Sequence, residues 1–133
     1  MKITIFGSTG GTGRHIVRKA LEHGHEVVAF ARTPSKLDIQ HSDLSMVEGD
    51  VREPEAVASA IDEADAVICA IGPTPGAPDD LMLKAAENII SGMQKHGVKR
   101  LIWSTGAGVE APEDEPTFMH KTISFLLKLI SKD

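Results

Sequence analysis

Tyrosine is absent from this chain of 133 residues, and tryptophan and cysteine each occur once. The single cysteine, Cys69, cannot form a disulfide within the chain, which favours a reducing compartment. No apolar run approaches the roughly 20 residues that span a bilayer. The start, "MKITIF", also lacks the long apolar region of a signal peptide. These absences predict a cytoplasmic protein without a membrane role.

Basic residues are outnumbered by acidic ones, 14 to 19, so the formal net charge is −5. A general nucleic-acid binder presents a basic face, so this balance argues against that class and favours a small-molecule substrate. The six histidines are scattered, without the HExxH or paired Cys/His spacing of zinc sites. No metal site is therefore predicted.

Apolar strand-like segments alternate with helix-like segments along the chain. Five buried strands are predicted, in "KITIF", "HEVVAFAR", "LSMVEGDV", "ADAVICAIG" and "VKRLIWSTG". Helices are predicted from Arg14 to His23, where Gly24 stops the helix, from Pro54, after Asp80, and over residues 117–131. Such alternation forms right-handed βαβ units. The predicted fold is α/β: a doubly wound parallel sheet of the Rossmann type, strand order 3-2-1-4-5, in one domain over residues 1–133.

The helix after "PTPGAPDD" has the clearest boundaries. Asp79 and Asp80 are its candidate amino-terminal caps, and Gly97 is its predicted terminator. Its inward face is predicted to contain Met82, Ala86, Ile89, Ile90 and Met93.

A glycine-rich turn, "GSTGGTG", lies between the first strand and the first helix. Gly7, Gly10 and Gly13 have the spacing of a dinucleotide-binding turn. There, the first glycine allows the tight turn, the second lets the backbone approach a pyrophosphate, and the third lets helix and strand pack closely. The helix amino-terminus would then direct free N–H groups at the phosphates. The alternative is a turn with a structural role alone, but its place in the first βα unit favours cofactor binding.

The end of the second strand bears on which dinucleotide binds. NAD-binding proteins usually carry a carboxylate there for the adenosine ribose, and this chain carries Arg32 instead. No Asp or Glu lies between Val27 and Leu37, whereas Arg32, Lys36 and Arg14 could surround a 2′-phosphate. The pattern favours NADP as cofactor. NAD stays open, because Arg32 and Lys36 could be ordinary solvated charges.

Five segments in order carry a family resemblance: "KITIFGSTGGTGRHIV", "VVAFARTPSKL", "VEGDVREPEAV", "DAVICAIG" and "NIISGMQKHGVKRLIWSTGAG". They resemble the NAD(P)H-binding atypical short-chain dehydrogenase/reductases, in particular the NmrA-like group that includes the biliverdin-IXβ/flavin reductases. The resemblance covers nearly the whole chain. It implies a Rossmann domain that binds NADP, with NAD as the less favoured cofactor.

The resemblance also implies roles for individual residues. The phosphate-binding turn and the 2′-phosphate ligand would comprise Gly7, Ser8, Thr9, Gly10, Thr12, Gly13, Arg14 and Arg32. Asp50 and Val51 would contact adenine, with Asp50 accepting a hydrogen bond from the amino group. Ala70, Ile71 and Gly72 would pass under the nicotinamide ribose, and Ser104 and Thr105 would lie beside the nicotinamide.

The chain departs from the family in its catalytic residues. Ordinary short-chain dehydrogenases use a Tyr-x-x-x-Lys pair, and this chain has no tyrosine. The family's catalytic serine falls on Gly106, which leaves Ser104 and Thr105 as the nearest hydroxyls. Two functions stay open. The favoured one is an NADPH-dependent reductase of a small conjugated or flavin-like acceptor; the alternative is a non-catalytic NADP(H)-sensing regulator that binds a partner protein.

The segment over residues 117–131 is apolar nearly all round, whereas a surface helix is amphipathic. The family usually continues into a substrate lobe beyond this point. We therefore expect a C-terminally truncated chain, with self-association or binding of a C-terminal fragment through this helix.

Overall fold

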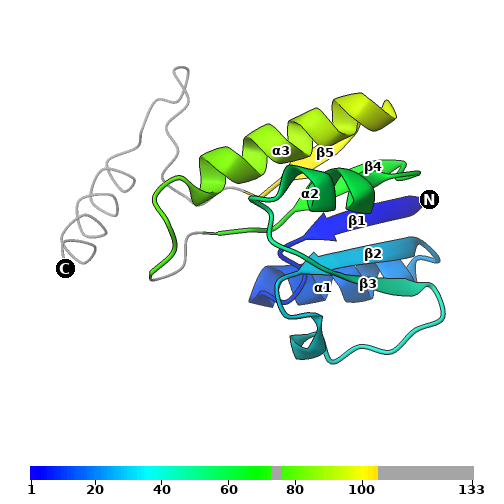
Figure 1. Cartoon of the computed structure of the whole chain (residues 1–133). Helices are drawn as coiled ribbons and strands as arrows, with labels where there is room; N and C mark the ends of the chain where they lie inside the picture. The colour runs from blue at the N-terminus through cyan, green and yellow to red at the C-terminus, as the bar shows by residue number, and fades with distance from the viewer. Residues whose placement is uncertain (73–75, 105–133) are drawn as a thin grey trace, which may run out of the picture.

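The computed structural model describes residues 1–72 and 76–104 of the chain. They form a five-stranded parallel sheet in the order β3-β2-β1-β4-β5, which confirms the predicted topology (Figure 1). The strands are β1 (Lys2–Phe6), β2 (Glu26–Ala31), β3 (Leu44–Glu48), β4 (Ala66–Cys69) and β5 (Leu101–Trp103). Each strand overlaps one of the five predicted segments.

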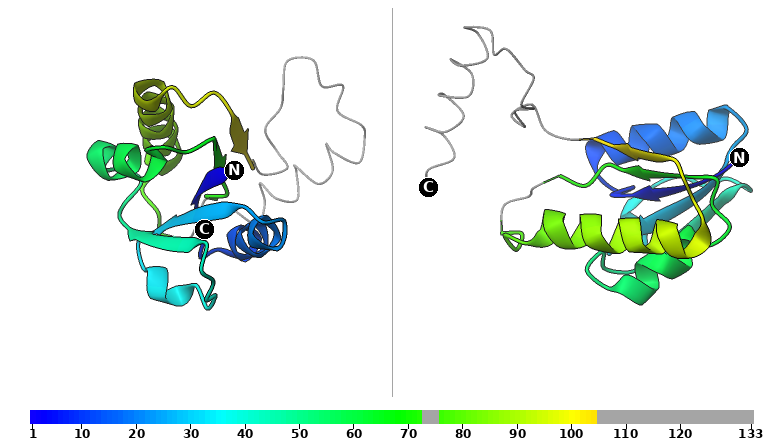
Figure 2. Two further views of the ribbon diagram at one scale, coloured as in Figure 1. Left: turned by 90° about the vertical axis from the view of Figure 1, so that its right-hand side faces the viewer. Right: turned by 90° about the horizontal axis from the view of Figure 1, so that it is seen from above.

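Helices cover both faces of this sheet. One face carries α1 (Gly11–Glu22), and the other carries α2 (Pro54–Ile61) and α3 (Leu81–His96) side by side (Figure 2). A short 3-10 turn, η1 (Pro34–Lys36), follows β2. This arrangement is the doubly wound form that right-handed βαβ crossovers produce. No helix in the described part of the chain is both long and apolar enough to cross a membrane.

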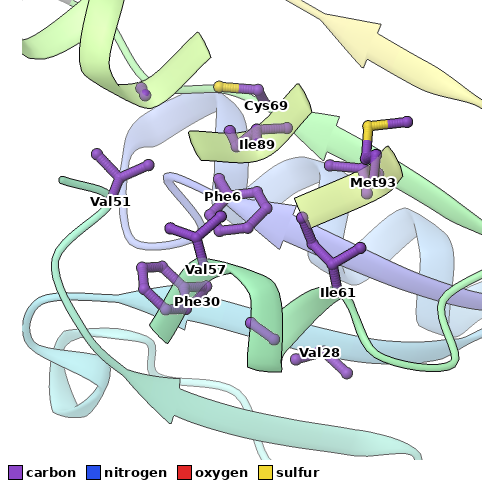
Figure 3. Close-up of a cluster of buried hydrophobic side chains, with 12 residues drawn as sticks. Phe6, Val28, Phe30, Val51, Val57, Ile61, Cys69, Ile89 and Met93 are labelled. Carbon is purple, nitrogen blue, oxygen red and sulfur yellow. The ribbon is translucent and has the colours of Figure 1, made fainter. Parts of the chain in front are cut away.

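The core consists of two apolar clusters, one on each face of the sheet. Alternate strand residues point to opposite faces. Ile3 and Ile5 of β1 therefore pack with α1, whereas Phe6 packs with α2 and α3. Figure 3 shows the cluster between the sheet and the helices α2 and α3. There, the ring centroids of Phe6 and Phe30 lie 5.0 Å apart. Cys69 is fully buried here, and burial raises the pKa of its thiol to about 11, so it is a packing residue.

The predicted inward face of α3 is partly wrong. Ile90 is 46% exposed, and the buried residues are Ala85, Ile89, Gly92 and Met93. The face is rotated because α2 approaches α3 at Gly92, where a Cβ atom would lie 3.2 Å from the Cα of Ala58. The helical spacing of apolar residues does not by itself reveal that a glycine lies at the centre of the contact between α2 and α3.

The helix ends agree with the predicted boundaries in most places. Gly24 follows α1 with φ 72°, and Gly97 ends α3 with φ 70°, both left-handed conformations that favour glycine. Asp80 is the amino-terminal cap residue of α3, but its side chain makes no capping hydrogen bond. The helix α1 begins at Gly11, three residues before the expected start at Arg14, so the glycine turn includes the first helical turn.

Candidate functional site

The turn between β1 and α1 is compact because of Gly7. Its φ of 77° is left-handed, and the N–H of Gly10 donates to its carbonyl at 3.1 Å. A Cβ atom on Gly7 would lie 2.8 Å from the carbonyl carbon of Ala70. Gly7 therefore lets the turn pack directly against the backbone that follows β4.

Gly13 closes the other side of this turn. A Cβ atom at Gly13 would overlap the carbonyl oxygen of Gly7 and lie 2.9 Å from the Cα of Ser8. The first turn of α1 thus packs on the backbone of the preceding loop without an intervening side chain. These two contacts give the glycine spacing its physical reason.

The amino-terminus of α1 offers free hydrogen-bond donors. The first bond of the helix runs from the N–H of Arg14 to the carbonyl of Gly10 at 3.0 Å. The N–H groups of Gly11, Thr12 and Gly13 precede it and have no acceptor within the helix. Gly10 supplies no capping side chain, and no acidic residue lies in the first turn. This end of the helix can bind an anion.

Arg14 connects the glycine turn to the end of β2. Its Nη2 donates to the carbonyl oxygen of Lys36 at 2.8 Å, which holds the turn Pro34–Lys36 beside α1. Its Nε is buried and has no partner in the described part of the chain. A buried donor without a partner is costly to the folded chain.

A pocket opens at the carboxyl ends of the strands, and we call it the strand-end pocket. Segments after four different strands meet there, together with the start of α3. Its lining consists of Gly7, Thr9, Gly10, Phe30, Ala31, Arg32, Gly49, Asp50, Val51, Ala70, Ile71, Gly72 and Leu81. This edge of a doubly wound sheet, next to the reversal of strand order at β1 and β4, is where such folds bind ligands.

The acidic group of the pocket is Asp50, and Arg52 holds it in place. The Oδ1 atom accepts from the Arg52 backbone N–H at 2.9 Å and from Nε at 3.0 Å, and Oδ2 accepts from Nη2 at 2.7 Å. These side-chain hydrogen bonds lower the pKa of Asp50 to about 2, with a smaller contribution from the charge of Arg32. Asp50 is therefore a carboxylate throughout the neutral range.

A second support comes from α3. The Asn88 side-chain Nδ2 donates to the carbonyl oxygen of Val51 at 2.9 Å. The N–H of Gly49 also donates to the carbonyl of Ala31 at 3.1 Å, which joins this loop to the end of β2. The loop that carries Asp50 and Val51 is thus anchored to its neighbours on two sides.

Not every predicted site residue faces the strand-end pocket. Ser8 is fully buried, and its hydroxyl donates to the carbonyl of Phe30 at 3.1 Å. Thr12 lies exposed in the first turn of α1. Ser104 directly follows β5, where its N–H donates to the carbonyl of Cys69 at 2.9 Å, and it is not one of the described residues that line the pocket. Thr105 and residues 117–131 lie outside the described residues.

Several contributors were not identified from the sequence. Phe30, Ala31, Gly49 and Leu81 line the pocket, and Arg52 and Asn88 anchor its loop. Only Gly49 carried a signal, as a glycine directly after a strand. Within residues 1–72 and 76–104, no three His, Cys, Asp or Glu side chains lie close enough together to bind a metal ion.

The geometry fits a dinucleotide. The Gly7 and Gly13 contacts leave a turn of bare backbone, and the free N–H groups of α1 begin there. The pocket itself combines apolar walls with a carboxylate and an arginine. The free N–H groups suit a diphosphate, and the apolar walls with their polar side chains suit a base and a ribose.

The ion pair between Asp50 and Arg52 predicts a pH dependence. Because the pKa of Asp50 is lowered on folding, the pair stabilises the folded chain above about pH 4, the usual range of an unfolded Asp. That contribution is lost as the pH falls from there through about 2. A carboxyl ¹³C NMR titration should give a pKa near 2 for Asp50, and Arg52→Met should raise it toward the ordinary value. An ordinary pKa in the unmodified chain would contradict the ion pair.

Comparison with known protein families gives one family over nearly the whole chain. A family model described as NAD(P)H-binding matches residues 7–132. That span includes the glycine turn and every residue that lines the strand-end pocket.

Three curated relatives illustrate the range of the similarity. YwnB of Bacillus subtilis is 38% identical over 108 residues, 81% of this chain and 48% of that protein. The photosystem II assembly factor Ycf39 of Synechocystis is 33% identical over 109 residues, 77% and 33% of the two chains. The 2-alkyl-3-oxoalkanoate reductase of Stenotrophomonas maltophilia is 30% identical over 114 residues, 82% and 34%. The chain therefore spans about a third to a half of the length of these relatives.

Solved structures show the same fold. The oxidoreductase ylbE of Lactococcus lactis matches with a TM-score of 0.76 and 26% identity, over 92% of this chain and 56% of that one. The enzyme WbmH of Bordetella bronchiseptica, solved in complex with NAD+, matches with a TM-score of 0.68 and 26% identity, over 87% and 43%.

Proposed function

The chain belongs to the NAD(P)H-binding family, and from this premise we propose that it binds NADP(H) in the strand-end pocket and acts as a reductase. The observation that carries the proposal is the meeting of predicted cofactor residues in one pocket. Gly7, Arg32, Asp50 and Ala70 follow four different strands and line the same opening. The family match extends across all four segments.

Each segment would hold a different part of the dinucleotide. The turn from Gly7 to Gly13 and the free N–H groups of α1 would bind the pyrophosphate. Asp50 and Val51 would border the adenine, and residues 70–72 would border the nicotinamide ribose. Ser104, at the end of β5, and Thr105, outside the described residues, are the hydroxyls that we propose beside the nicotinamide.

Preference for NADP over NAD rests on the end of β2. Arg32 lines the pocket where NAD-binding proteins usually place a carboxylate. Arg14, on α1, donates to the backbone carbonyl of Lys36 and so holds the turn that follows β2 beside α1. An arginine fork suits a phosphate group in both charge and geometry.

The proposed reaction is hydride transfer to a small conjugated or flavin-like acceptor. A bound reduced nicotinamide supplies the hydride. The chain has no tyrosine to donate a proton, so the proton would come from water or from the substrate. The family relative named a 2-alkyl-3-oxoalkanoate reductase supports reductase chemistry, without indicating this acceptor.

A second candidate function is a non-catalytic NADP(H) sensor of the NmrA-like type that binds a partner protein. The relative named a photosystem II assembly factor supports it, and the missing tyrosine is compatible with both candidates. Both candidates require the same cofactor pocket. They differ in whether bound NADPH is consumed and in whether a partner protein is bound.

Calorimetric titration and an acceptor screen test these proposals. We expect NADPH to bind more tightly than NADH, and its absorbance at about 340 nm to fall when FMN, a quinone or biliverdin is added. Binding without oxidation by any acceptor would favour the sensor. Failure to bind either cofactor would overturn both functions.

A further inference from the structure

The arginine that holds Asp50 has no role in the function proposed above. On the premise of that function, we propose that Arg52 is a positioning residue that makes the pocket selective for a 6-amino purine over a 6-keto purine. It would do so by fixing the Asp50 carboxylate in one orientation at the pocket wall. Arg52 itself is not one of the described residues that line the pocket.

The hydrogen bonds leave Asp50 little freedom. A carboxylate offers about four lone-pair sites, two on each oxygen. Oδ1 accepts twice, from the backbone N–H and from Nε of Arg52, and Oδ2 accepts once, from Nη2. One acceptor site therefore remains, on Oδ2, for a single donor from a ligand.

The exposure of the two side chains fits this division of roles. The Asp50 side chain is 19% exposed, whereas the Arg52 side chain is 45% exposed. Asp50, the less exposed of the two, lines the pocket, and the more exposed Arg52 holds it without lining the pocket. The N–H of Glu53 also donates to the Asp50 carbonyl at 2.9 Å, so the backbone is held as well.

A fixed carboxylate discriminates by charge and by hydrogen bonding. The amino group of adenine is a donor and can use the free site on Oδ2. The keto oxygen of hypoxanthine is an acceptor and would face a carboxylate that cannot turn away. A keto oxygen at this place would be repelled by the carboxylate and would leave the free site on Oδ2 unpaired, so the 6-keto ligand should bind less tightly.

A purely structural role for Arg52 predicts a different pattern. If the ion pair only stabilises the loop, its removal weakens all dinucleotides alike. The same holds if Arg52 acts only as a positive charge near the phosphates. The ratio of two affinities that differ only at the purine therefore separates positioning from both alternatives.

The experiment compares NADPH with its hypoxanthine analogue by calorimetric titration of the full chain. The variants are Arg52→Met, Asp50→Asn and the double variant, each checked for folding by circular dichroism. The control is Lys19→Met, which breaks the exposed ion pair between Lys19 and Glu22 on α1, away from the pocket. Hydrogen bonds to charged groups suggest a preference for NADPH of about tenfold or more in the unmodified chain.

We expect Arg52→Met to reduce that preference at least about threefold, and Lys19→Met to leave it unchanged. In the Asp50→Asn background, Arg52→Met should cause no further loss, because the group that it positions is gone. Equal weakening of both ligands by Arg52→Met, or no change in their ratio, would overturn the inference. Equal binding of both ligands by the unmodified chain would overturn it too, while binding of neither would instead refute the proposed function on which it depends.

Discussion

Replacement of Gly13 by alanine is expected to remove measurable NADPH binding and to lower the free energy of unfolding by about 1–3 kcal/mol or more. The added Cβ would overlap the carbonyl oxygen of Gly7 and lie 2.8 Å from its carbonyl carbon. Both contacts are with backbone, so no side-chain rotation can relieve them. The turn would have to open, and it is this turn that brings the α1 amino-terminus to the pocket.

Gly11→Ala is the matched control, because it adds the same methyl group two residues earlier in the same helix. A Cβ atom on Gly11 would meet nothing within 4 Å. Alanine also has a higher helix propensity than glycine, so this variant should be as stable as the unmodified chain or slightly more stable. Chemical denaturation and calorimetric titration of both variants make the comparison. If Gly13→Ala proves as stable and as competent as Gly11→Ala, the close contact does not control the turn.

The sequence predicted the parts of the site that local pattern and topology determine. Apolar strands alternating with helices dictate a parallel sheet with crossovers on both faces, and the observed strand order follows. Given that topology, residues directly after the strands must gather at one edge. The glycine spacing and the end of the second strand placed Gly7 and Arg32 at this edge, the family resemblance added Asp50 and Ala70, and all four line the strand-end pocket.

The parts that were missed depend on contacts between distant residues. Asn88 supports the carbonyl of Val51 across 37 residues of sequence, and no pattern around Asn88 indicates this. Arg52 stands among other charged residues, and only its three hydrogen bonds to Asp50 distinguish it. Ser8 matched the family turn, yet its hydroxyl binds the carbonyl of Phe30. Tertiary geometry, rather than residue type, decides these roles.

The two candidate functions share one requirement at the ribose end of the pocket. A 2′-phosphate is a dianion or nearly so, and it needs donors and positive charge around it. In the described part of the pocket lining, Arg32 is the positively charged residue, and it lies near enough to Asp50 to lower the pKa of that carboxyl. We therefore propose that Arg32 provides the positive charge for the 2′-phosphate.

Arg32→Asp is accordingly expected to weaken NADPH binding by roughly 1.5–3 kcal/mol, or about 10- to 150-fold, and to leave NADH binding little changed. The variant removes a charged hydrogen-bond donor and places a carboxylate where the 2′-phosphate would lie, so repulsion adds to the loss. The control, Lys99→Asp, makes the same change in net charge in the exposed segment just before β5, at the far edge of the sheet. Because salt screens charges that far from the pocket, it should leave both affinities nearly unchanged. Calorimetric titration of both cofactors against both variants decides the matter. If Arg32→Asp weakens NADPH and NADH equally, Arg32 supports the fold of the pocket, and cofactor preference must come from another group.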